Sequence, residues 1–292
     1  MLKTAAHKTK KRNLRCGRFL LAIGERTYVM GILNRTPDSF SDGALFMDES
    51  TALRHARKMA AEGADIIDVG GESTRPGSDP VSTEEELKRT IPIIKRLSKE
   101  LTIPISVDTS KHEVAFEAIK AGASIVNDIT ALRKDTKMAN VISDSDVAVC
   151  LMHMKGTPKN MQENPVYEDL MKEIIAGLEE SINVALKSGI SGDRIIVDPG
   201  IGFGKTTEHN LQIIKHLSEL TVLDKPILIG TSRKSFIGNM LKKDVSERLM
   251  GTLATSVVAI MNGADIIRVH DIKETLDAAK MVDAVKREWT QC

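Results

Sequence analysis

The sequence predicts an α/β protein, a (β/α)8 TIM barrel preceded by an N-terminal β-hairpin. Short apolar runs alternate with longer amphipathic stretches, which is typical of βα units around a parallel sheet. One helix-to-strand joint recurs three times, and no linker or shift in composition divides the 292 residues. Such a barrel needs about 250 residues. We therefore expect a basic, flexible tail over residues 1–13 and one domain over residues 14–292.

The elements follow in order along the chain. Segments 14–23 and 27–33 flank Gly24-Glu25-Arg26, which predicts a hairpin that covers the lower mouth of the barrel. The sequence then contains eight apolar runs that predict the barrel strands. They are residues 27–33, 65–69, 104–107, 124–126, 147–151, 194–197, 226–229 and 265–269.

Boundary signals predict where the helices begin and end. Asp48 opens a helix through Glu62, Ser82 begins a sequence that resembles a capping box, and Ser246 leads a helix from 247 to 261. Segments 62–67, 121–126 and 262–267 share one pattern. In each, a helix ends, a glycine supplies the left-handed cap, and a buried strand starts at once.

Composition excludes several classes of protein. Hydrophobic residues make up 41% and charged residues 28%, as in ordinary globular proteins, so wholesale disorder is excluded. A formal net charge of +1 provides no general attraction to nucleic acid or to a membrane surface. Three widely spaced cysteines indicate neither a disulfide framework nor a metal knuckle, and they suit the cytoplasm.

Two segments carry a further expectation. The first 18 residues contain seven basic side chains and no acidic one. A transit peptide is one alternative, but the segment lacks serine and a clear amphipathic period, which favours a solvated tail.

The longest uncharged run, 249–264, is too short to span a membrane and predicts a buried helix. It also hints at a surface buried between subunits, and we expect a homodimer.

Polar residues end all eight predicted strands, which is where barrels of this type place their active sites. A role in a turn or helix cap explains any one of these polar residues. Burying polar groups at all eight strand ends costs free energy, however, unless a ligand hydrogen-bonds to them. The residues are Asn34, Asp68, Asp108, Asn127 with Asp128, His153, Asp198, residues 230–234, and Arg268 with His270.

The strand ends divide into acceptors and cations. Asp108, Asn127 and Asp198 suit the N–H-rich edge of an aminopyrimidinone. A metal site is the alternative, but no His-rich cluster joins these acids. Lys234, Arg268 and His270 follow strands seven and eight, where barrels often bind phosphate, and the loop runs into a helix start. Neither a Walker loop nor a full dinucleotide motif is present. The long polar loops 36–43 and 72–80 are candidate lids.

Taken together, these segments resemble the dihydropteroate synthases, a family of pterin-binding barrel enzymes. The matching blocks keep the family's order and span nearly the whole chain after the basic tail. They are residues 30–34, 36–43, 68–77, 106–109, 127–128, 152–154, 198–205, 232–235 and 268–271. The resemblance implies condensation of p-aminobenzoate with (7,8-dihydropterin-6-yl)methyl diphosphate, giving 7,8-dihydropteroate and pyrophosphate in folate biosynthesis, with Mg²⁺ as cofactor.

The resemblance also implies roles for single residues. Asp108, Asn127, Asp198 and Lys234 hold the pterin, Met152 and Phe203 form its apolar walls, and Gly230 belongs to the substrate-binding set. Arg268 and His270 bind the diphosphate, and Asn34 is a ligand of the metal ion that accompanies it. Thr74, Arg75, Pro76, Lys234 and Ser235 shape the aminobenzoate pocket. Two residues depart from the family pattern. Arg35 occupies a position where a small or apolar residue is usual, and Ala44 occupies a position where a second glycine is usual.

The expected chemistry is electrostatic. The reacting methylene is attached to an electron-rich ring, so diphosphate can leave ahead of attack, with Arg268, His270 and Mg²⁺ stabilising its charge. Lys234 completes the catalytic set with Asp42, which we expect to face the developing cation. An arylamine is neutral at pH 7, so we assign no general base.

Two other functions compete with this interpretation. A corrinoid-dependent methyltetrahydrofolate methyltransferase would share Asp108, Asn127 and Asp198, but it binds no diphosphate. A non-catalytic barrel that serves as a partner subunit is the second alternative, and the intact polar strand ends count against it.

Overall fold

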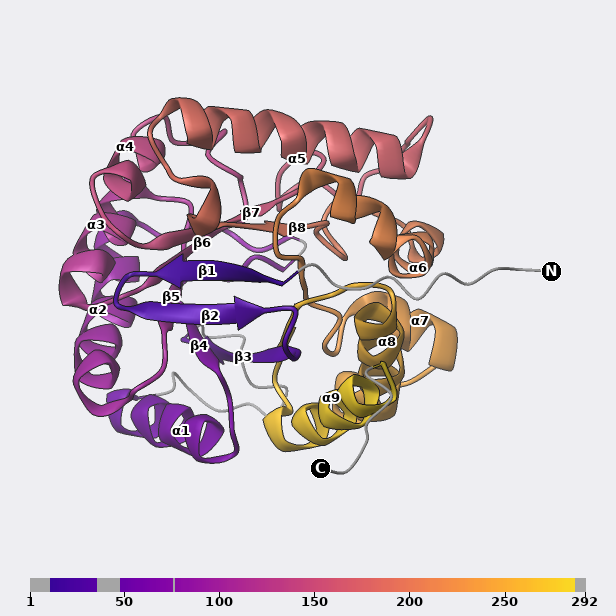
Figure 1. The fold of residues 1–292 in the computed structure, drawn as a ribbon, viewed down its shortest axis with the longest axis horizontal. Helices are drawn as coiled ribbons and strands as arrows, with labels where there is room; N and C mark the ends of the chain where they lie inside the picture. The colour runs from indigo at the N-terminus through magenta and orange to yellow at the C-terminus, as the bar shows by residue number, and fades with distance from the viewer. Residues whose placement is uncertain (1–10, 36–47, 76, 287–292) are drawn as a thin grey trace.

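The computed structural model describes residues 11–35, 48–75 and 77–286. Its centre is a parallel eight-stranded sheet (Figure 1) in the order β8-β7-β6-β5-β4-β3-β10-β9. A parallel bridge between Val197 and Ile227 joins the two ends of this order, so the sheet closes into the predicted barrel. The strands are β3 (Tyr28–Asn34), β4 (Ile66–Gly70), β5 (Ile105–Asp108), β6 (Ile125–Asp128), β7 (Ala148–Met152), β8 (Ile195–Asp198), β9 (Leu228–Ile229) and β10 (Ile266–Val269).

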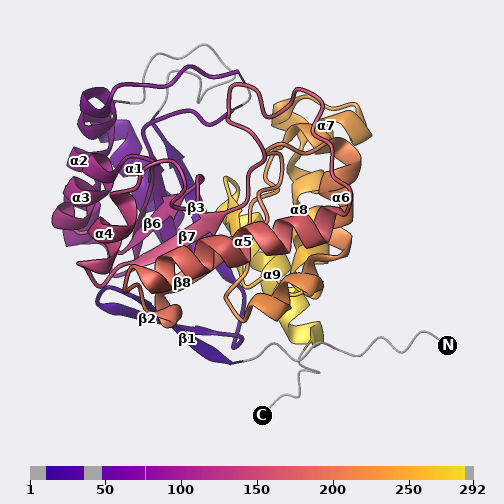
Figure 2. The ribbon, with the colours of Figure 1, turned by 90° about the horizontal axis from the view of Figure 1, so that it is seen from above.

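Helices surround the strands (Figures 1 and 2). They are α1 (Glu49–Ala61), α2 (Thr83–Glu100), α3 (His112–Ala121), α4 (Met138–Ser143), α5 (Leu170–Lys187), α6 (Thr207–Lys215), α7 (Ser235–Leu241), α8 (Leu249–Met261) and α9 (Ile272–Lys286). Short 3-10 helices span Gly192–Arg194, Leu217–Leu223 and Val245–Glu247. Among the described residues, no helix combines the length and apolar character that crossing a membrane requires.

Each predicted apolar run overlaps one barrel strand, and most strands begin one residue later than predicted. The strands β3, β5 and β8 also end one residue later than predicted, so their last residues are Asn34, Asp108 and Asp198. The predicted helix starts at Asp48 and Ser82 are confirmed, because both side chains accept a backbone N–H at the N-cap. The three repeated joints are also confirmed, since Gly63, Gly122 and Gly263 all have φ near +100°.

Apolar side chains form two main layers. The larger core fills the space between strands and helices and includes Leu33, Ile67 and Val107. A second core fills the inside of the barrel, with Met30, Ile66, Ile125, Cys150 and Ile196 among its members. Successive strand residues alternate between these two layers, as the pleat of a strand requires.

The predicted hairpin is present, but its turn is not at Gly24-Glu25-Arg26. Strands β1 (Arg12–Cys16) and β2 (Phe19–Ile23) pair antiparallel around Gly17 and Arg18, while residues 28–34 belong to the barrel. Gly17 has a φ of 57°, which suits a two-residue hairpin turn. The hairpin also includes Arg12 and Asn13 of the predicted tail, and residues 1–10 lie outside the described residues.

The hairpin covers the barrel end at which the strands begin (Figure 2). Leu14, Cys16, Leu21 and Ile23 are buried in the inner core. The Gly17 N–H donates to the carbonyl oxygen of Asp146, which precedes β7, at 2.9 Å. The opposite end, where the strands finish, is therefore the end that carries the candidate site.

Another prediction needs correction. Most of the uncharged run 249–264 forms α8 as expected, with residues 262–264 following the helix, but α8 is not buried all round. Thr252, Ser256, Ala259 and Ile260 are buried, whereas the exposed fractions of Met250 and Met261 are 69% and 48%. Lack of charge along a helix does not show whether its own chain covers every face.

Candidate active site

The strand register places three of the predicted residues in one row with Gly70. Asn34 pairs with Gly70, Gly70 with Asp108, and Asp108 with Asn127, across β3 to β6. A Cβ built on Gly70 would lie 3.3 Å from Asn34 Oδ1 and 3.6 Å from Asp108 Cβ, so these two side chains flank one glycine. The absence of a side chain at Gly70 keeps this part of the barrel mouth open.

Arg268 at the end of β10 connects this row across the barrel. Its Nη2 donates to Asp108 Oδ2 at 2.8 Å, and its Nε donates to Asp68 Oδ2 at 2.6 Å. The same Asp68 oxygen accepts from Asn127 Nδ2 at 3.1 Å. Asp68 was noted in the sequence only as a strand end, and the structure adds it to the site as the buried carboxylate that orients Arg268 and Asn127.

Burial and charge oppose each other in this network. Burial would lower the pKa of Arg268, but the Asp68 and Asp108 carboxylates outweigh it and raise the pKa above its ordinary value. Burial raises the pKa of Asp108 to about 7, although Arg268 opposes that shift. The guanidinium therefore stays charged, and Asp108 depends on it to remain a carboxylate.

A second group of predicted residues meets on the β7–β8 side. Met152 and Asp198 pair at the ends of these strands. Lys234 donates to the carbonyl oxygen of Ile201, and its Nζ lies 4.8 Å from the centre of the Phe203 ring. Phe203 packs with Met152 in a small apolar cluster at the barrel mouth. The two predicted apolar walls therefore lie together, next to a carboxylate and an ammonium.

The charges of this group also interact. Burial raises the pKa of Asp198, and Lys234 opposes the shift. Burial lowers the pKa of Lys234 to about 8, and Asp198 opposes that shift. The Gly200 N–H donates to Asp198 Oδ1 at 2.7 Å, which fixes one carboxylate oxygen against the loop. The other oxygen is available to a ligand N–H.

His270 and Ser232 form a third group, after β10 and β9. The His270 N–H donates to Ser232 Oγ at 3.3 Å, and the same Oγ lies 2.9 Å from His270 Nδ1. Because the hydroxyl accepts the backbone N–H, its own proton can go to Nδ1, which leaves a proton on Nε2. Burial, with the charges of Arg233 and Arg268, lowers the pKa of His270 to about 3. The imidazole is thus a neutral donor at pH 7.

The loop between β9 and α7 is held firmly. Arg233, at a φ of 56°, makes two hydrogen bonds to Asp271, and its N–H donates to Thr252 Oγ1 at 3.0 Å. Gly230 follows β9, and a Cβ there would be 3.7 Å from the Arg268 carbonyl oxygen. These contacts fix the backbone on both sides of Ser232.

Other predicted site residues lie on loops around the strand ends. Ser235 is the first residue of α7 and follows Lys234. Thr74 and Arg75 lie on the loop after β4, and the charge of Arg75 contributes to lowering the pKa of His270. Asp42 and Pro76 lie outside the described residues.

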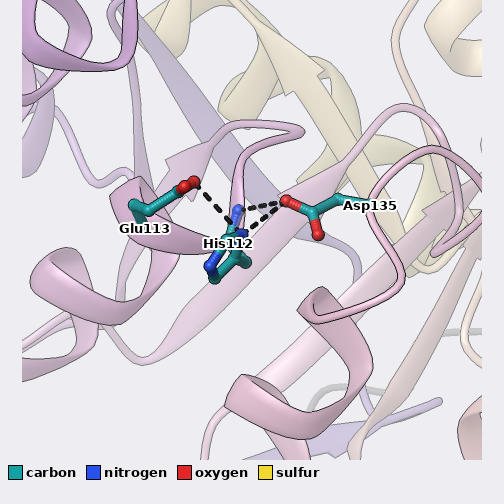
Figure 3. Close-up of side chains that lie close together, drawn as sticks. All are labelled: His112, Glu113 and Asp135. Atoms are coloured by element: carbon teal, nitrogen blue, oxygen red, sulfur yellow. Dashed lines mark hydrogen bonds and ion pairs between the residues drawn. The ribbon is translucent and has the colours of Figure 1, made fainter.

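A further polar cluster lies where α3 begins. His112, Glu113 and Asp135 gather their ligand atoms within 4.8 Å, a spacing that could hold a metal ion (Figure 3). Asp135 Oδ2, however, accepts the His112 backbone N–H at 2.9 Å and lies 2.7 Å from His112 Nδ1. These bonds give Asp135 a capping role at the start of α3.

A closed parallel barrel with a convergent polar site at the carboxyl ends of its strands is the architecture of a TIM-barrel enzyme. A family model described as "Pterin binding enzyme" matches residues 30–270. The dihydropteroate synthase of Clostridium beijerinckii is 52% identical over 266 residues, which cover 91% of this chain and 96% of that protein.

Solved structures agree with this relationship. The Yersinia pestis dihydropteroate synthase with a sulfonamide drug complex has a TM-score of 0.91 and 44% identity, and covers 94% of this chain and 100% of its own. The Clostridium difficile dihydropteroate synthase in the presence of pteroic acid has a TM-score of 0.85 and 50% identity, covering 91% and 98%. The chain belongs to the pterin-binding enzymes and, within them, to the dihydropteroate synthases.

Proposed function

We propose that the chain condenses p-aminobenzoate with (7,8-dihydropterin-6-yl)methyl diphosphate to give 7,8-dihydropteroate and pyrophosphate in folate biosynthesis. One observation carries the proposal. The acceptors Asp108, Asn127 and Asp198 share a single barrel mouth with the cations Lys234 and Arg268. This combination suits a ligand with an N–H-rich ring and an anionic tail. The Clostridium difficile relative was solved in the presence of pteroic acid, a compound that joins a pterin to aminobenzoate.

The pterin would lie on the β5 to β8 side of the mouth. Asp198 would accept ring N–H groups through the oxygen that Gly200 leaves free, and Asn127 would use its amide oxygen. Met152 and Phe203 would contact the faces of the ring, since both belong to the apolar cluster at the mouth. Burial in such a site strengthens each hydrogen bond and makes an unpaired carboxylate costly.

The diphosphate would lie toward β3, β9 and β10. Arg268 would donate to it as a cation and His270 as a neutral imidazole. Asn34 Oδ1, beside Gly70, is a hard oxygen ligand of the kind that Mg²⁺ accepts together with water and substrate phosphate oxygens. The site therefore fits a magnesium ion bound mainly through the substrate. When bound, Mg²⁺ would neutralise charge on the leaving diphosphate.

The aminobenzoate would bind between the loops that carry Thr74 to Pro76 and the start of α7 at Ser235. In the reaction the C–O bond to diphosphate breaks, the amine nitrogen forms the new C–N bond with the methylene carbon, and the nitrogen then releases one proton to solvent. Arg268 and His270 would stabilise the departing charge, and Asp42 would face the positive charge on the pterin. The amine reacts in its neutral form, so the proposal assigns no general base. Sulfonamides, as mimics of aminobenzoate, would compete at the same place.

The assembly that we propose is a homodimer formed through the helices after β9. Exposed apolar side chains gather on α7, α8 and α9, which lie on one side of the barrel (Figure 1). A surface of this kind is usually covered by a partner. The residues are Met240, Leu241, Met250, Val258, Met261, Met281 and Val285. Sedimentation velocity should show a dimer that Met250→Lys converts to a monomer, and a monomeric wild type would contradict this proposal.

The activity is tested by mixing the purified chain with both substrates and measuring dihydropteroate and pyrophosphate. We expect equal amounts of the two products in the presence of Mg²⁺ and a large loss of turnover when the metal is chelated. Pyrophosphate release without dihydropteroate, or no reaction with Mg²⁺ present, would contradict the proposal.

A further inference from the structure

The beginning of the loop after β4 lies directly against α2. A Cβ built on Gly71 would be 2.8 Å from Thr90 Cγ2 and 3.1 Å from Glu86 Cγ, both on α2. The carbonyl oxygen of Gly71 accepts from Arg89 Nη1 at 2.9 Å. The backbone is therefore fixed to the helix just before the loop continues toward Thr74 and Arg75.

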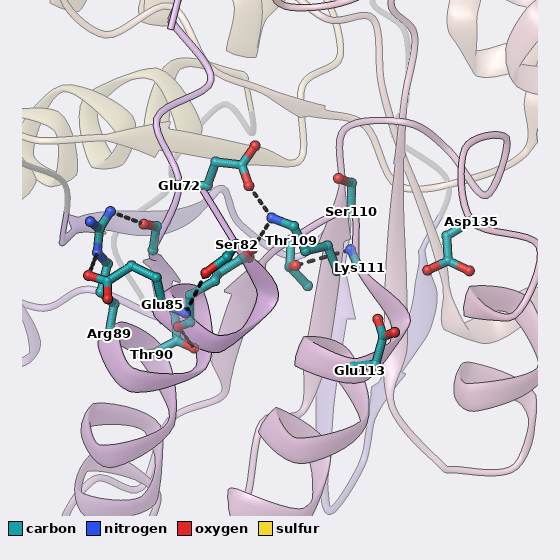
Figure 4. A network of polar contacts seen from close by, with 12 residues as sticks. Glu72, Ser82, Glu85, Arg89, Thr90, Thr109, Ser110, Lys111, Glu113 and Asp135 are labelled. Carbon is teal, nitrogen blue, oxygen red and sulfur yellow. Dashed lines mark hydrogen bonds and ion pairs between the residues drawn. The ribbon is translucent and has the colours of Figure 1, made fainter. Parts of the chain in front are cut away.

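The next residue, Glu72, is tied to the same helix through Lys111. The Lys111 ammonium donates to the carboxylate of Glu72 (Figure 4). It also donates to the carboxylate of Glu86. The Glu86 side chain is 1% exposed, and those of Lys111 and Glu72 are 16% and 19% exposed. A carboxylate as buried as Glu86 requires a counter-charge. Lys111 is thus held in place by Glu86, and Glu72 binds an ammonium whose position is already determined.

Lys111 lies three residues after Asp108, which ends β5, and it directly precedes α3. Thr109, between them, accepts the Lys111 backbone N–H through Oγ1 at 3.2 Å, and the Lys111 ammonium reaches Glu86 on α2. The segment after β5, the N-terminal half of α2 and the start of the second loop therefore form one connected unit. Asp108 faces the proposed pterin site, whereas Thr74 and Arg75 belong to the proposed aminobenzoate site.

We propose that Lys111 is a positioning residue for the aminobenzoate half of the reaction: by binding Glu72 it sets where Thr74 and Arg75 stand. The inference rests on the proposed function, because only that function assigns aminobenzoate to this loop. It differs from a purely structural role of Lys111 as counter-ion of Glu86. A structural role would lower stability or affect both substrates alike, whereas positioning of this loop affects aminobenzoate.

The test separates the two roles with variants that leave no unpaired charge at Lys111 or Glu86, the two most buried members of the cluster. Glu72→Gln removes the loop side of the link and keeps the Lys111–Glu86 pair. The double variant K111M/E86Q removes the link from the helix side while neutralising both partners. Glu84→Gln, on the exposed face of the same helix, is the matched control.

We expect Glu72→Gln and K111M/E86Q each to raise the KM for aminobenzoate about tenfold, with the KM for the pterin diphosphate changed by less than about twofold. The control should match the wild type. An unchanged KM for aminobenzoate in either variant, or equal increases in both KM values, would overturn the inference while wild-type turnover still supports the proposed function.

Backbone hydrogen exchange gives a readout that does not need turnover. Amides of the described residues 72–75 and 77–79 should exchange faster in Glu72→Gln than in the wild type, and Glu84→Gln should leave them unchanged. Unchanged exchange over this segment would overturn the inference even if the wild type proved to have a different activity.

Discussion

The guanidinium of Arg268 donates to the carboxylate of Asp108 at 2.8 Å, joining the ends of β10 and β5 across the barrel mouth. The same guanidinium holds Asp68, whose side chain is fully buried. One cation therefore balances two carboxylates in a region where an unpaired charge is costly. The proposed pterin and diphosphate sites meet at this residue.

Arg268→Met should lower the free energy of unfolding by about 3–5 kcal/mol, because it leaves buried Asp68 without its counter-charge and Asp108 must take up a proton. Urea unfolding at pH 7.5 measures the change. Arg57→Met is the control, since the Arg57–Glu100 ion pair lies at the surface, and its unfolding curve should match the wild type. If the unfolding curve of Arg268→Met matched the wild type, the ion pairs of Arg268 with Asp68 and Asp108 would make no contribution to stability.

Ser232→Ala should reduce kcat about five- to tenfold, because the hydroxyl no longer favours the His270 tautomer that carries its proton on Nε2. The KM for aminobenzoate should stay near the wild-type value, since Ser232 acts through His270, which is assigned to the diphosphate. Ser181→Ala is a matched control in a buried hydroxyl outside the site, where Oγ donates to the Gly177 carbonyl oxygen. Equal kcat values for the two variants would remove Ser232 from this role.

Lys205 predicts a pH dependence of stability. The side chain is buried and lies 3.1 Å from His153 Nδ1 and 3.0 Å from the Phe203 carbonyl oxygen. Burial lowers the pKa of Lys205 from 10.5 to about 7. Between these values the unfolded chain binds more protons than the folded one, so the free energy of unfolding rises with pH, by about 1.4 kcal/mol per pH unit at most.

Lys205→Met removes this titration. Urea unfolding at pH 7, 8, 9 and 10 should show the wild type gaining stability relative to Lys205→Met as pH rises, because contributions of other groups cancel in the difference. A difference that stays constant over this range would contradict the lowered pKa of Lys205.

Leu14→Ala should lower the free energy of unfolding by about 2–5 kcal/mol, since Leu14 is fully buried where the hairpin covers the barrel. Both KM values should remain unchanged, because the hairpin lies at the end opposite the candidate site. Thermal unfolding with steady-state kinetics measures both effects. A raised KM without loss of stability would place the hairpin in the site instead.

The sequence predicts the strands and the residues that end them, because apolar runs and glycine caps are local signals. Other features depend on contacts between distant residues. The role of Asp68 follows from Arg268, 200 residues away in sequence. The predicted hairpin turn at Gly24-Glu25-Arg26 is wrong, because the strand that pairs with residues 12–16 is 19–23, which buries Leu14 and Leu21 together in the barrel. The neutral state of His270 arises from burial that composition does not reveal.

Binding of pteroic acid to Asp198→Ala tests whether this barrel mouth holds the pterin. Calorimetric titration should show an affinity weaker by about 2–4 kcal/mol than in the wild type, which corresponds to roughly 30- to 1000-fold in Kd. Asp193→Ala, at the opposite end of β8, should bind as the wild type does. An unchanged Kd in Asp198→Ala, with the variant folded, would contradict the placement of the pterin in this barrel mouth.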